Sequence, residues 1–136
     1  MSQVWPVITA MYDAYARGDR AGVDALLHPE CTIFDSASPE LITSRAQLEA
    51  VRDARPTSGP ATDPATDPAT DPAGGPAEIG VTPGEPVIHE WADTAVAAYV
   101  LRVDFDNGEP ELVRTTTVLR RDQGRWLIAH VHENTI

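Results

Sequence analysis

Apolar residues recur at helical spacing in the first part of the chain. Between positions 4 and 15 they follow one another every three or four residues, which predicts an amphipathic helix. A second helix is predicted over 20–27, because Pro29 disfavours helical geometry in the residue before it. A third helix opens at Ser44 and Gln47, whose spacing is a capping-box pattern. The inward stripe of the first helix would be Val4, Ile8, Met11, Tyr12 and Tyr15.

Strand patterns dominate the rest of the chain. A short strand is expected over 31–35 and a still shorter one over 41–43. After position 86, β-branched and aromatic residues form further runs that are separated by turn residues, which predicts consecutive antiparallel strands. These runs are 87–91, 94–105, 112–121 and 125–132.

The last hairpin carries apolar residues at both parities, so both of its faces need cover. Helices in a chain of 136 residues can cover one face and leave a pocket there. We therefore expect the other, outer face to meet a second copy of the chain in a homodimer. Along the final strand, one face has Trp126, Ile128, His130 and His132, and the other has Leu127, Ala129, Val131 and Glu133.

The segment 56–86 changes character, because Ala-Thr-Asp-Pro occurs three times in succession at its centre. Proline at every fourth position removes amide donors and fixes φ, so neither a helix nor a central strand is expected. We predict one domain over 1–136 that contains a disordered insertion at 56–86. The insertion is either a passive, solvated loop or a lid over a site.

Composition excludes several classes of partner. The net charge is −11, with ten arginines and no lysine, so phosphates would be repelled over most approaches and neither nucleic acid nor a membrane is an expected partner. Cys31 is the single cysteine and has apolar neighbours, so we expect it to be a small buried residue. A chain without a second cysteine for a disulfide is typical of a reducing compartment. With no secretory start and no spanning segment, the expected location is the cytoplasm.

The segment from Tyr12 to Asp35, with Gly-Asp after the first helix, and the Gly-Arg-Trp of the last hairpin resemble the nuclear transport factor 2-like superfamily. Within it, the chain is similar to SnoaL-like and ketosteroid-isomerase-like proteins and to the association domain of calcium/calmodulin-dependent kinase II. The resemblance covers nearly everything except 56–86. It implies an α+β fold in which a cone-shaped, curved antiparallel sheet wraps around three N-terminal helices and an apolar pocket, usually in a dimer.

Asp35 is the main candidate for chemistry. A carboxylate that closes the apolar strand around Phe34 would lie at the edge of a desolvated pocket, where its pKa can rise toward that of a useful general base. The resemblance places Asp35 where ketosteroid isomerases carry their general-base aspartate. The alternative is an aspartate that caps the turn at 35–38 through its own backbone amides.

Proton abstraction beside a carbonyl also needs a donor for the enolate oxygen. In the resemblance, the oxyanion tyrosine of the isomerases falls on Met11, with Tyr12 one place away and Tyr15 one turn further on. Their second acid falls on Thr116 or Thr117, which disfavours steroid isomerisation because a threonine is a weaker donor than a carboxylic acid. Tyr12 and Tyr15 are therefore the candidate catalytic donors, and the alternative is that both are core aromatics.

Five residues are candidates for contact with a ligand. Arg114 lies in an otherwise apolar strand, where its guanidinium could bind a carboxylate or phenolate through two hydrogen bonds, unless an acidic neighbour already pairs with it. Thr116, Trp5 and Phe34 are expected to line the pocket. Glu133 is expected to face its mouth.

The histidines do not form an evident metal site. His130 and His132 could point at one ion, but a zinc centre needs a third ligand and a second shell, and His28 and His89 are not placed to converge on them. We predict no metal and no cofactor. By the resemblance, the face that carries His130 and His132 is turned away from the pocket.

The sequence favours a small-molecule-binding protein whose ligand is apolar or carbonyl-bearing. One hypothesis is a cofactor-free isomerase or cyclase in which Asp35 is the base and Tyr12 or Tyr15 is the donor. The other is a non-catalytic ligand-binding or oligomeric assembly module that resembles the kinase association domain.

Overall fold

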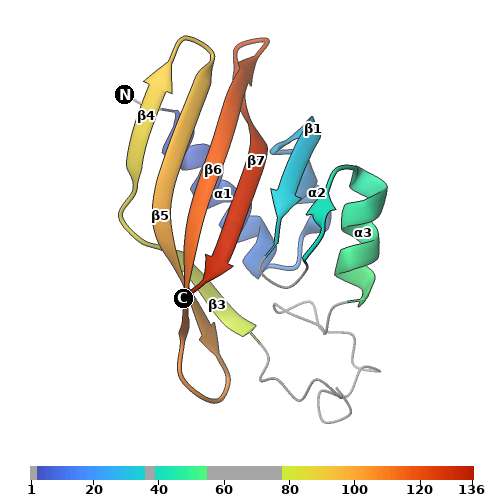
Figure 1. Ribbon diagram of the computed structural model, residues 1–136, viewed down its shortest axis with the longest axis vertical. Helices are drawn as coiled ribbons and strands as arrows, with labels where there is room; N and C mark the ends of the chain where they lie inside the picture. The colour runs from blue at the N-terminus through green and yellow to red at the C-terminus, as the bar shows by residue number, and fades with distance from the viewer. Residues whose placement is uncertain (1–2, 36–38, 55–77) are drawn as a thin grey trace.

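The computed structural model describes residues 3–35, 39–54 and 78–136, which form three helices and one curved, seven-stranded sheet. The long helix α1 crosses one side of the sheet, and the shorter helices lie at the end near β1 (Figure 1). The helices are α1 (Val4–Ala16), α2 (Arg20–Asp24) and α3 (Arg45–Ala54). The strands are β1 (Leu27–Phe34), β2 (Leu41–Ile42), β3 (Glu78–Pro83), β4 (Val87–Trp91), β5 (Thr94–Phe105), β6 (Glu111–Asp122) and β7 (Arg125–Thr135).

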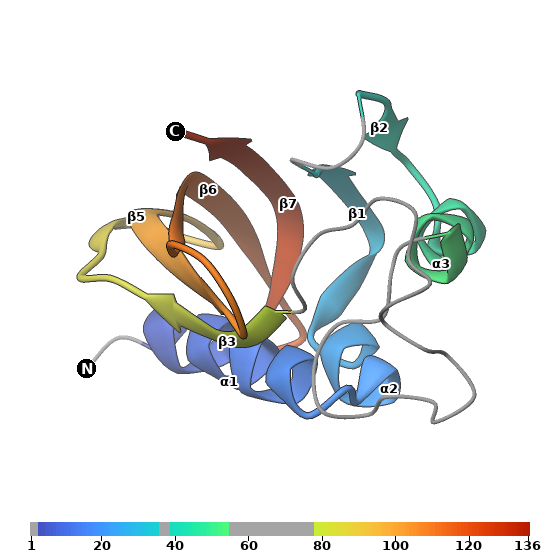
Figure 2. The same cartoon turned by 90° about the horizontal axis from the view of Figure 1, so that it is seen from below.

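The strand order is β2-β1-β7-β6-β5-β3, and β4 also pairs with β5. Seen from below, the sheet bends over α1 without closing into a barrel (Figure 2). The α+β class and the curved sheet agree with the sequence prediction. One pairing departs from it, because β1 runs parallel to β7 whereas the other pairs are antiparallel.

The core lies between α1 and the concave side of the sheet, which we call the inner face. Side chains of α1 and alternate residues of β5, β6 and β7 fill it, and the remaining parity of each strand forms the outer face. The buried strand residues of the inner face are Ala95, Ala97, Tyr99, Leu101, Val103, Val113, Thr115, Thr117, Leu119, Trp126, Ile128 and Val131.

A β-bulge at Ala129 changes the facing of the last strand. Val118 pairs with His130 whereas Leu119 pairs with Ile128, so Ala129 of β7 has no pairing partner in β6. Trp126 and Ile128 are consequently buried on the same face as Val131, and His130 turns outward. The strict alternation predicted for this strand, with Ile128 and His130 on one face, was wrong because the bulge shifts the parity by one.

The helix boundaries follow local capping. Asp19 accepts a hydrogen bond from the amide of Gly22 at 2.9 Å and begins α2, which is shorter than predicted. The chain then enters β1, because the Ile128 amide donates to the Leu26 carbonyl. At the start of α3, Ser44 Oγ accepts from the Gln47 amide at 3.1 Å, as the capping-box pattern predicts, and the Gln47 side chain accepts from the amide of Thr43, one residue before the cap, at 3.0 Å.

The segment predicted as a disordered insertion contains a strand. β3 pairs with β5 from Glu78 to Pro83, so the prediction was wrong for this end of 56–86. Proline is compatible with a strand at a sheet edge, where its missing amide removes no bond from a central ladder. Positions 56–77 lie outside the described residues. Within the described part of the chain, no helix is long and apolar enough to cross a membrane.

Candidate functional site

Three hydroxyl groups form a hydrogen-bonded chain in the core. The Tyr12 and Tyr99 hydroxyls lie 2.8 Å apart, and the Tyr99 hydroxyl lies 2.9 Å from Thr117 Oγ1. All three residues are buried, with exposed fractions of 6%, 5% and 0%. We call these three residues the hydroxyl chain. It joins α1, β5 and β6 through polar groups that satisfy one another away from water.

Local sequence explains why these groups meet. Tyr12 belongs to the inward stripe of α1, and Tyr99 and Thr117 share the inner parity of β5 and β6, where Tyr99 pairs with Thr115 and Ala97 pairs with Thr117. Tyr99 and Thr117 are therefore diagonal neighbours on one face. Small Ala97 leaves room for the tyrosine ring beside it.

Trp5 joins the same cluster. Its ring meets that of Tyr99 edge-on with centroids 5.2 Å apart, and the Tyr12 ring meets Tyr99 in the same way at 6.0 Å. Trp5 is half-buried, so it lies between the hydroxyl chain and solvent. The predicted pocket residue Trp5 thus lies beside the candidate donor Tyr12, although the space between them is filled by Tyr99.

The electrostatics keep both phenols protonated. Burial raises the pKa of Tyr12 well above its usual value, and the charge of Glu133 raises it further. Burial likewise raises the pKa of Tyr99 to about 12, although its hydrogen bonds to Thr117 and Tyr12 act in the opposite direction. At neutral pH both phenols are hydrogen-bond donors that can approach a carbonyl oxygen without carrying charge.

Two carboxylates belong to the same region of the sheet. Glu133 pairs with Thr115 on the inner face and is half-buried. Phe34 pairs with His132, so the next residues along β1 and β7 are Asp35 and Glu133. Asp35 is half-buried, and alternation along β1 would direct its side chain to the inner side.

Tyr15 has a different environment from Tyr12. Its hydroxyl donates to Glu78 Oε2 of β3 rather than to the hydroxyl chain. A shallow hollow of about 10 Å³ lies there between α1 and β3, room for about one water molecule. Its walls are Tyr15, Ala16, Glu78, Ile79, Gly80 and Val81. Tyr15 therefore has an acceptor of its own on β3, although one helix carries both tyrosines.

Three predicted ligand contacts lie on the outer face instead. Thr116 and Arg114 are exposed because Val113, Thr115 and Thr117 take the inner parity of β6. Arg114 donates to Asn134 Oδ1 at 2.7 Å. Phe34 is exposed on the outer face, where its ring lies 5.3 Å from that of His132. These placements are corrections, since a pocket on the inner face is out of reach of all three side chains.

The histidines also lie on the outer face or in structural contacts. His130 Nδ1 lies 2.7 Å from Thr32 Oγ1, and His89 stacks on Trp91 at 5.8 Å. The buried His28 accepts a hydrogen bond from the Glu30 amide through Nδ1. Among residues 3–35, 39–54 and 78–136, no group of three or more His, Cys, Asp or Glu side chains could hold a metal ion.

Sequence reasoning missed Tyr99 and left Thr117 undecided. The run Ala95, Ala97, Tyr99 and Leu101 carries an alternation that could have placed Tyr99 on the inner face. Thr117 could not be distinguished from Thr116 because both parities of β6 contain apolar residues. The hydrogen-bonded centre of the site is therefore a residue that sequence reasoning had not singled out.

Comparisons with known proteins agree with this architecture. A family model described as SnoaL-like domain matches residues 4–134. None of the curated proteins compared with the sequence matches it.

Solved structures share the fold at low sequence identity. A nuclear transport factor 2-like protein of unknown function from Pseudomonas putida aligns with a TM-score of 0.74 and 16% identity over 97% of this chain and 83% of its own. The association domain of the Caenorhabditis elegans (C. elegans) calcium/calmodulin-dependent kinase II gives 0.69 and 21% over 96% and 92%. A ketosteroid isomerase-like protein from Parabacteroides distasonis gives 0.68 and 18% over 96% and 85%. At these identities the likeness shows the fold alone.

Proposed function

This chain belongs to the SnoaL-like domain family, and on that premise we propose that its inner face binds a small, neutral, carbonyl-bearing molecule. The further proposal is that the protein acts on this molecule by acid/base chemistry without a cofactor, as an isomerase or cyclase. The observation that carries the proposal is the hydroxyl chain, in which the Tyr12 hydroxyl lies 2.8 Å from that of Tyr99.

Proton transfer needs a base and a donor with complementary properties. Asp35 is the proposed base, because it is half-buried and directly follows β1, where continued alternation would turn its carboxylate to the inner side. It would take a proton from the carbon beside the carbonyl, and the C–H electron pair would form the enolate. The Tyr12 hydroxyl would donate a hydrogen bond to the enolate oxygen, and the protonated Asp35 would return the proton at another carbon.

Charge and access define the proposed ligand. Burial raises the pKa of both Tyr12 and Tyr99, and the charge of Glu133 raises it further. Desolvation and the charge of Glu133 would therefore both disfavour an anionic ligand at the hydroxyl chain. Trp5 is half-buried against Tyr99, and it is the side chain that a ligand would displace to reach the phenols. A neutral cyclic ketone fits these requirements better than a carboxylate does.

Deuterium exchange at the carbon beside a ketone tests this proposal without knowledge of the product. The protein is incubated in D₂O with a panel of neutral cyclic ketones such as 2-tetralone, and exchange is followed by NMR. Wild-type protein should accelerate exchange, and Asp35→Asn should lower the acceleration by about 10²- to 10⁴-fold, the range for a general base. Glu111→Gln, which changes another half-buried carboxylate, is the matched control. Undiminished exchange in Asp35→Asn, with unchanged melting, would reject Asp35 as the base.

A second candidate function is assembly through the outer face. This face carries exposed apolar side chains on several strands, including Val87, Val100 and Leu112, at 61%, 42% and 46%. Exposed apolar side chains among polar ones, such as Arg114 and Thr116, make this face a candidate protein interface. Kinase association and hub domains are among the structures that share the fold. The proposed occupant is a second copy of this chain, in a homodimer.

Sedimentation equilibrium of single variants tests the assembly. Val100→Asp places a carboxylate in the middle of the outer face and should convert dimers to monomers. Ile79→Asp, at an exposed position beside α1, should leave the dimer intact. Equal assembly of the two variants would count against an interface on the outer face.

A further inference from the structure

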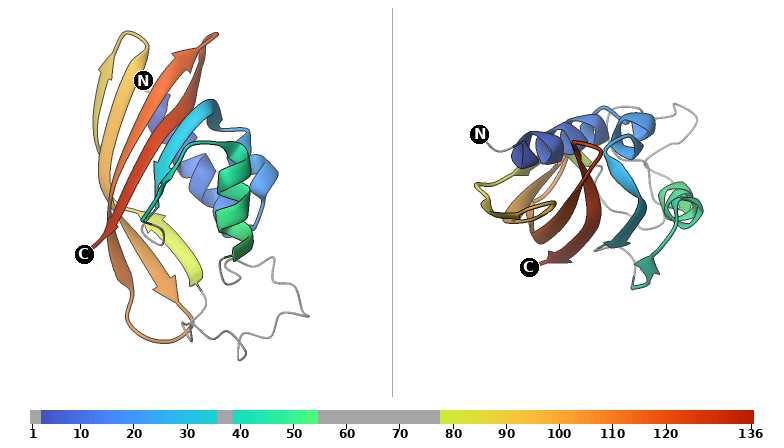
Figure 3. Two further views of the ribbon diagram at one scale, coloured as in Figure 1. Left: turned by 45° about the vertical axis from the view of Figure 1, so that its right-hand side comes forward. Right: turned by 90° about the horizontal axis from the view of Figure 1, so that it is seen from above.

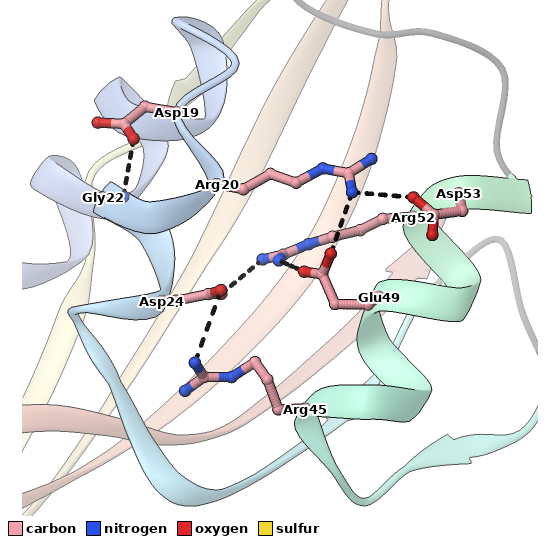
Figure 4. A network of polar contacts seen from close by, with 8 residues as sticks. All are labelled: Asp19, Arg20, Gly22, Asp24, Arg45, Glu49, Arg52 and Asp53. Carbon is pink, nitrogen blue, oxygen red and sulfur yellow. Dashed lines mark hydrogen bonds and ion pairs between the residues drawn. The ribbon is translucent and has the colours of Figure 1, made fainter.

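Ion pairs connect α3 to α2. Asp24 of α2 accepts a bond from Arg52 at 3.0 Å and lies 3.6 Å from Arg45. Arg20, the first residue of α2, lies 3.1 Å from Glu49 and 3.0 Å from Asp53 of α3. Figure 4 shows these side chains reaching across the space between the two helices, with Arg52 also bonded to Glu49. We call this group the ionic clasp.

Few apolar side chains attach α3 to the rest of the fold. Among its side chains at 45–53, Leu48 is buried and Val51 is half-buried, whereas Ala46 and Ala50 are exposed. The helix stands at the edge of the fold beside β1 and β2, away from the centre of the sheet (Figure 3). Burial of one leucine is a small fraction of the apolar burial that holds α1.

Cys31 reports on the position of α3. It lies on β1 at the inner parity, next to outward-facing Thr32, and is partly buried. Burial raises the pKa of its thiol to about 11, and the positive charge of Arg45 partly offsets this effect. Arg45 belongs to the first turn of α3, so that end of the helix lies near the thiol. A thiol of this kind reacts slowly while the surrounding structure is closed.

We propose that α3 is an electrostatically latched lid over the inner side of β1, which opens as a unit when the ionic clasp is screened and leaves the sheet folded. The lid lies beyond the proposed chemistry, because neither Tyr12 nor Asp35 belongs to the clasp. It makes access to the inner side of β1 depend on ionic strength.

The physical basis is the kind of bond that holds the helix. Partly exposed ion pairs weaken as salt shortens the screening length, from about 30 Å at 0.01 M to about 3 Å at 1 M, whereas apolar packing does not weaken in this way. Asp24 is the central group, because both Arg45 and Arg52 meet its carboxylate. Its side chain is 20% exposed and that of Arg52 is 14% exposed. The clasp is therefore open to screening, but only in part.

The reaction rate of Cys31 with a neutral dipyridyl disulfide tests the lid. A neutral reagent is needed because salt would alter the encounter of an anionic reagent with a protein of net charge −11. The rate is measured at neutral pH between about 0.01 and 1 M sodium chloride, where screening changes most. It should rise about fivefold to thirtyfold with salt. A small free thiol supplies the correction for any effect of salt on the reagent.

Two matched variants locate the effect. Asp24→Asn removes a carboxylate shared by two arginines, so its rate at low salt should already exceed that of wild type. Its remaining salt dependence, which comes from the pairs of Arg20, should be smaller than that of wild type. Asp104→Asn removes a carboxylate that pairs with Arg102 at 2.9 Å on β5, away from the clasp. It should keep the wild-type rate and the wild-type salt dependence. Amide hydrogen exchange should show faster exchange in α3 alone, with β5–β7 still protected.

Two results would overturn the lid. A Cys31 rate that neither salt nor Asp24→Asn changes would mean that apolar packing holds α3. A rate that rises only where urea stability falls in proportion would mean that α3 unfolds together with the sheet. Global stability is measured on the same samples so that these cases are separated.

Discussion

Tyr99→Phe removes the central member of the hydroxyl chain while it keeps the ring in place. The change deletes two hydrogen bonds, at 2.8 Å to Tyr12 and at 2.9 Å to Thr117. Each is worth about 1 kcal/mol net, and each buried hydroxyl that loses its partner adds part of a penalty of about 1–3 kcal/mol. Because Tyr12 is 6% exposed and Thr117 is 0% exposed, water does not readily replace the lost oxygen. The free energy of unfolding should fall by about 2–4 kcal/mol.

Urea unfolding followed by tryptophan fluorescence measures this change, provided that the m-value stays constant. Thr117→Val is the comparison, because it deletes one bond and should cost about 1 kcal/mol. In the double variant the free energy of unfolding should fall by less than the sum of the two single losses. Both single changes remove the same bond between Tyr99 and Thr117, which the double variant can lose only once. A value for Tyr99→Phe within about 0.5 kcal/mol of wild type would refute the hydroxyl chain, because that range is typical of exposed positions.

Two further predictions concern alkaline pH and the start of α2. The pKa of Tyr99 is about 12 in the folded protein against 10.0 in the unfolded chain, so the folded state holds more protons between these two values. The resulting stability is present below pH 10, and about 3 kcal/mol is lost as the pH rises through 12. Urea midpoints at increasing alkaline pH should fall for wild type and fall less steeply in Tyr99→Phe, where the raised pKa of Tyr12 still contributes, and equal slopes would contradict this. Gly22→Ala should destabilise by about 1 kcal/mol although alanine favours helices, because the new Cβ would lie 2.4 Å from Asp19 Oδ2. In an Asp19→Ala background the same change should cost less, because the new Cβ then meets only the Ala14 Cβ, at 3.2 Å. Thermal melts of the four proteins that show an equal cost in both backgrounds would contradict the clash.

Hydrophobic periodicity predicted most of the fold. The stripe of α1 and the alternation of β4–β7 each extend over enough residues to identify the element, and the turn before Arg125 has the positive φ of 78° that Gly124 allows. The family resemblance supplied the curvature and the placement of helices. Local capping at Ser44 was visible because its partner lies three residues away.

The failures have different physical origins. The parallel pairing of β1 with β7 joins residues about a hundred positions apart, such as Thr32 and His130, which no local pattern records. The bulge at Ala129 lies within the last hairpin, but alternation along β7 gives no signal of the extra residue. β3 was missed because its proline and glycine weaken the strand signal, although β5 supplies the ladder. Thr116 was chosen instead of Thr117 because β6 has apolar residues at both parities. Its pattern therefore does not show which of these two neighbouring threonines faces inward.

NMR mapping of a bound ketone tests the central claim, that a small neutral molecule binds at the inner face. Isotope-labelled protein is titrated with 2-tetralone, and amide shifts are followed for all assigned residues. The account predicts saturable shifts at Asp35, Tyr99, Thr115 and Glu133, which lie together around the inner face, and none at Val87 or Leu112. Shifts confined to the outer face, or no saturable shift for any neutral ketone of the panel, would contradict it.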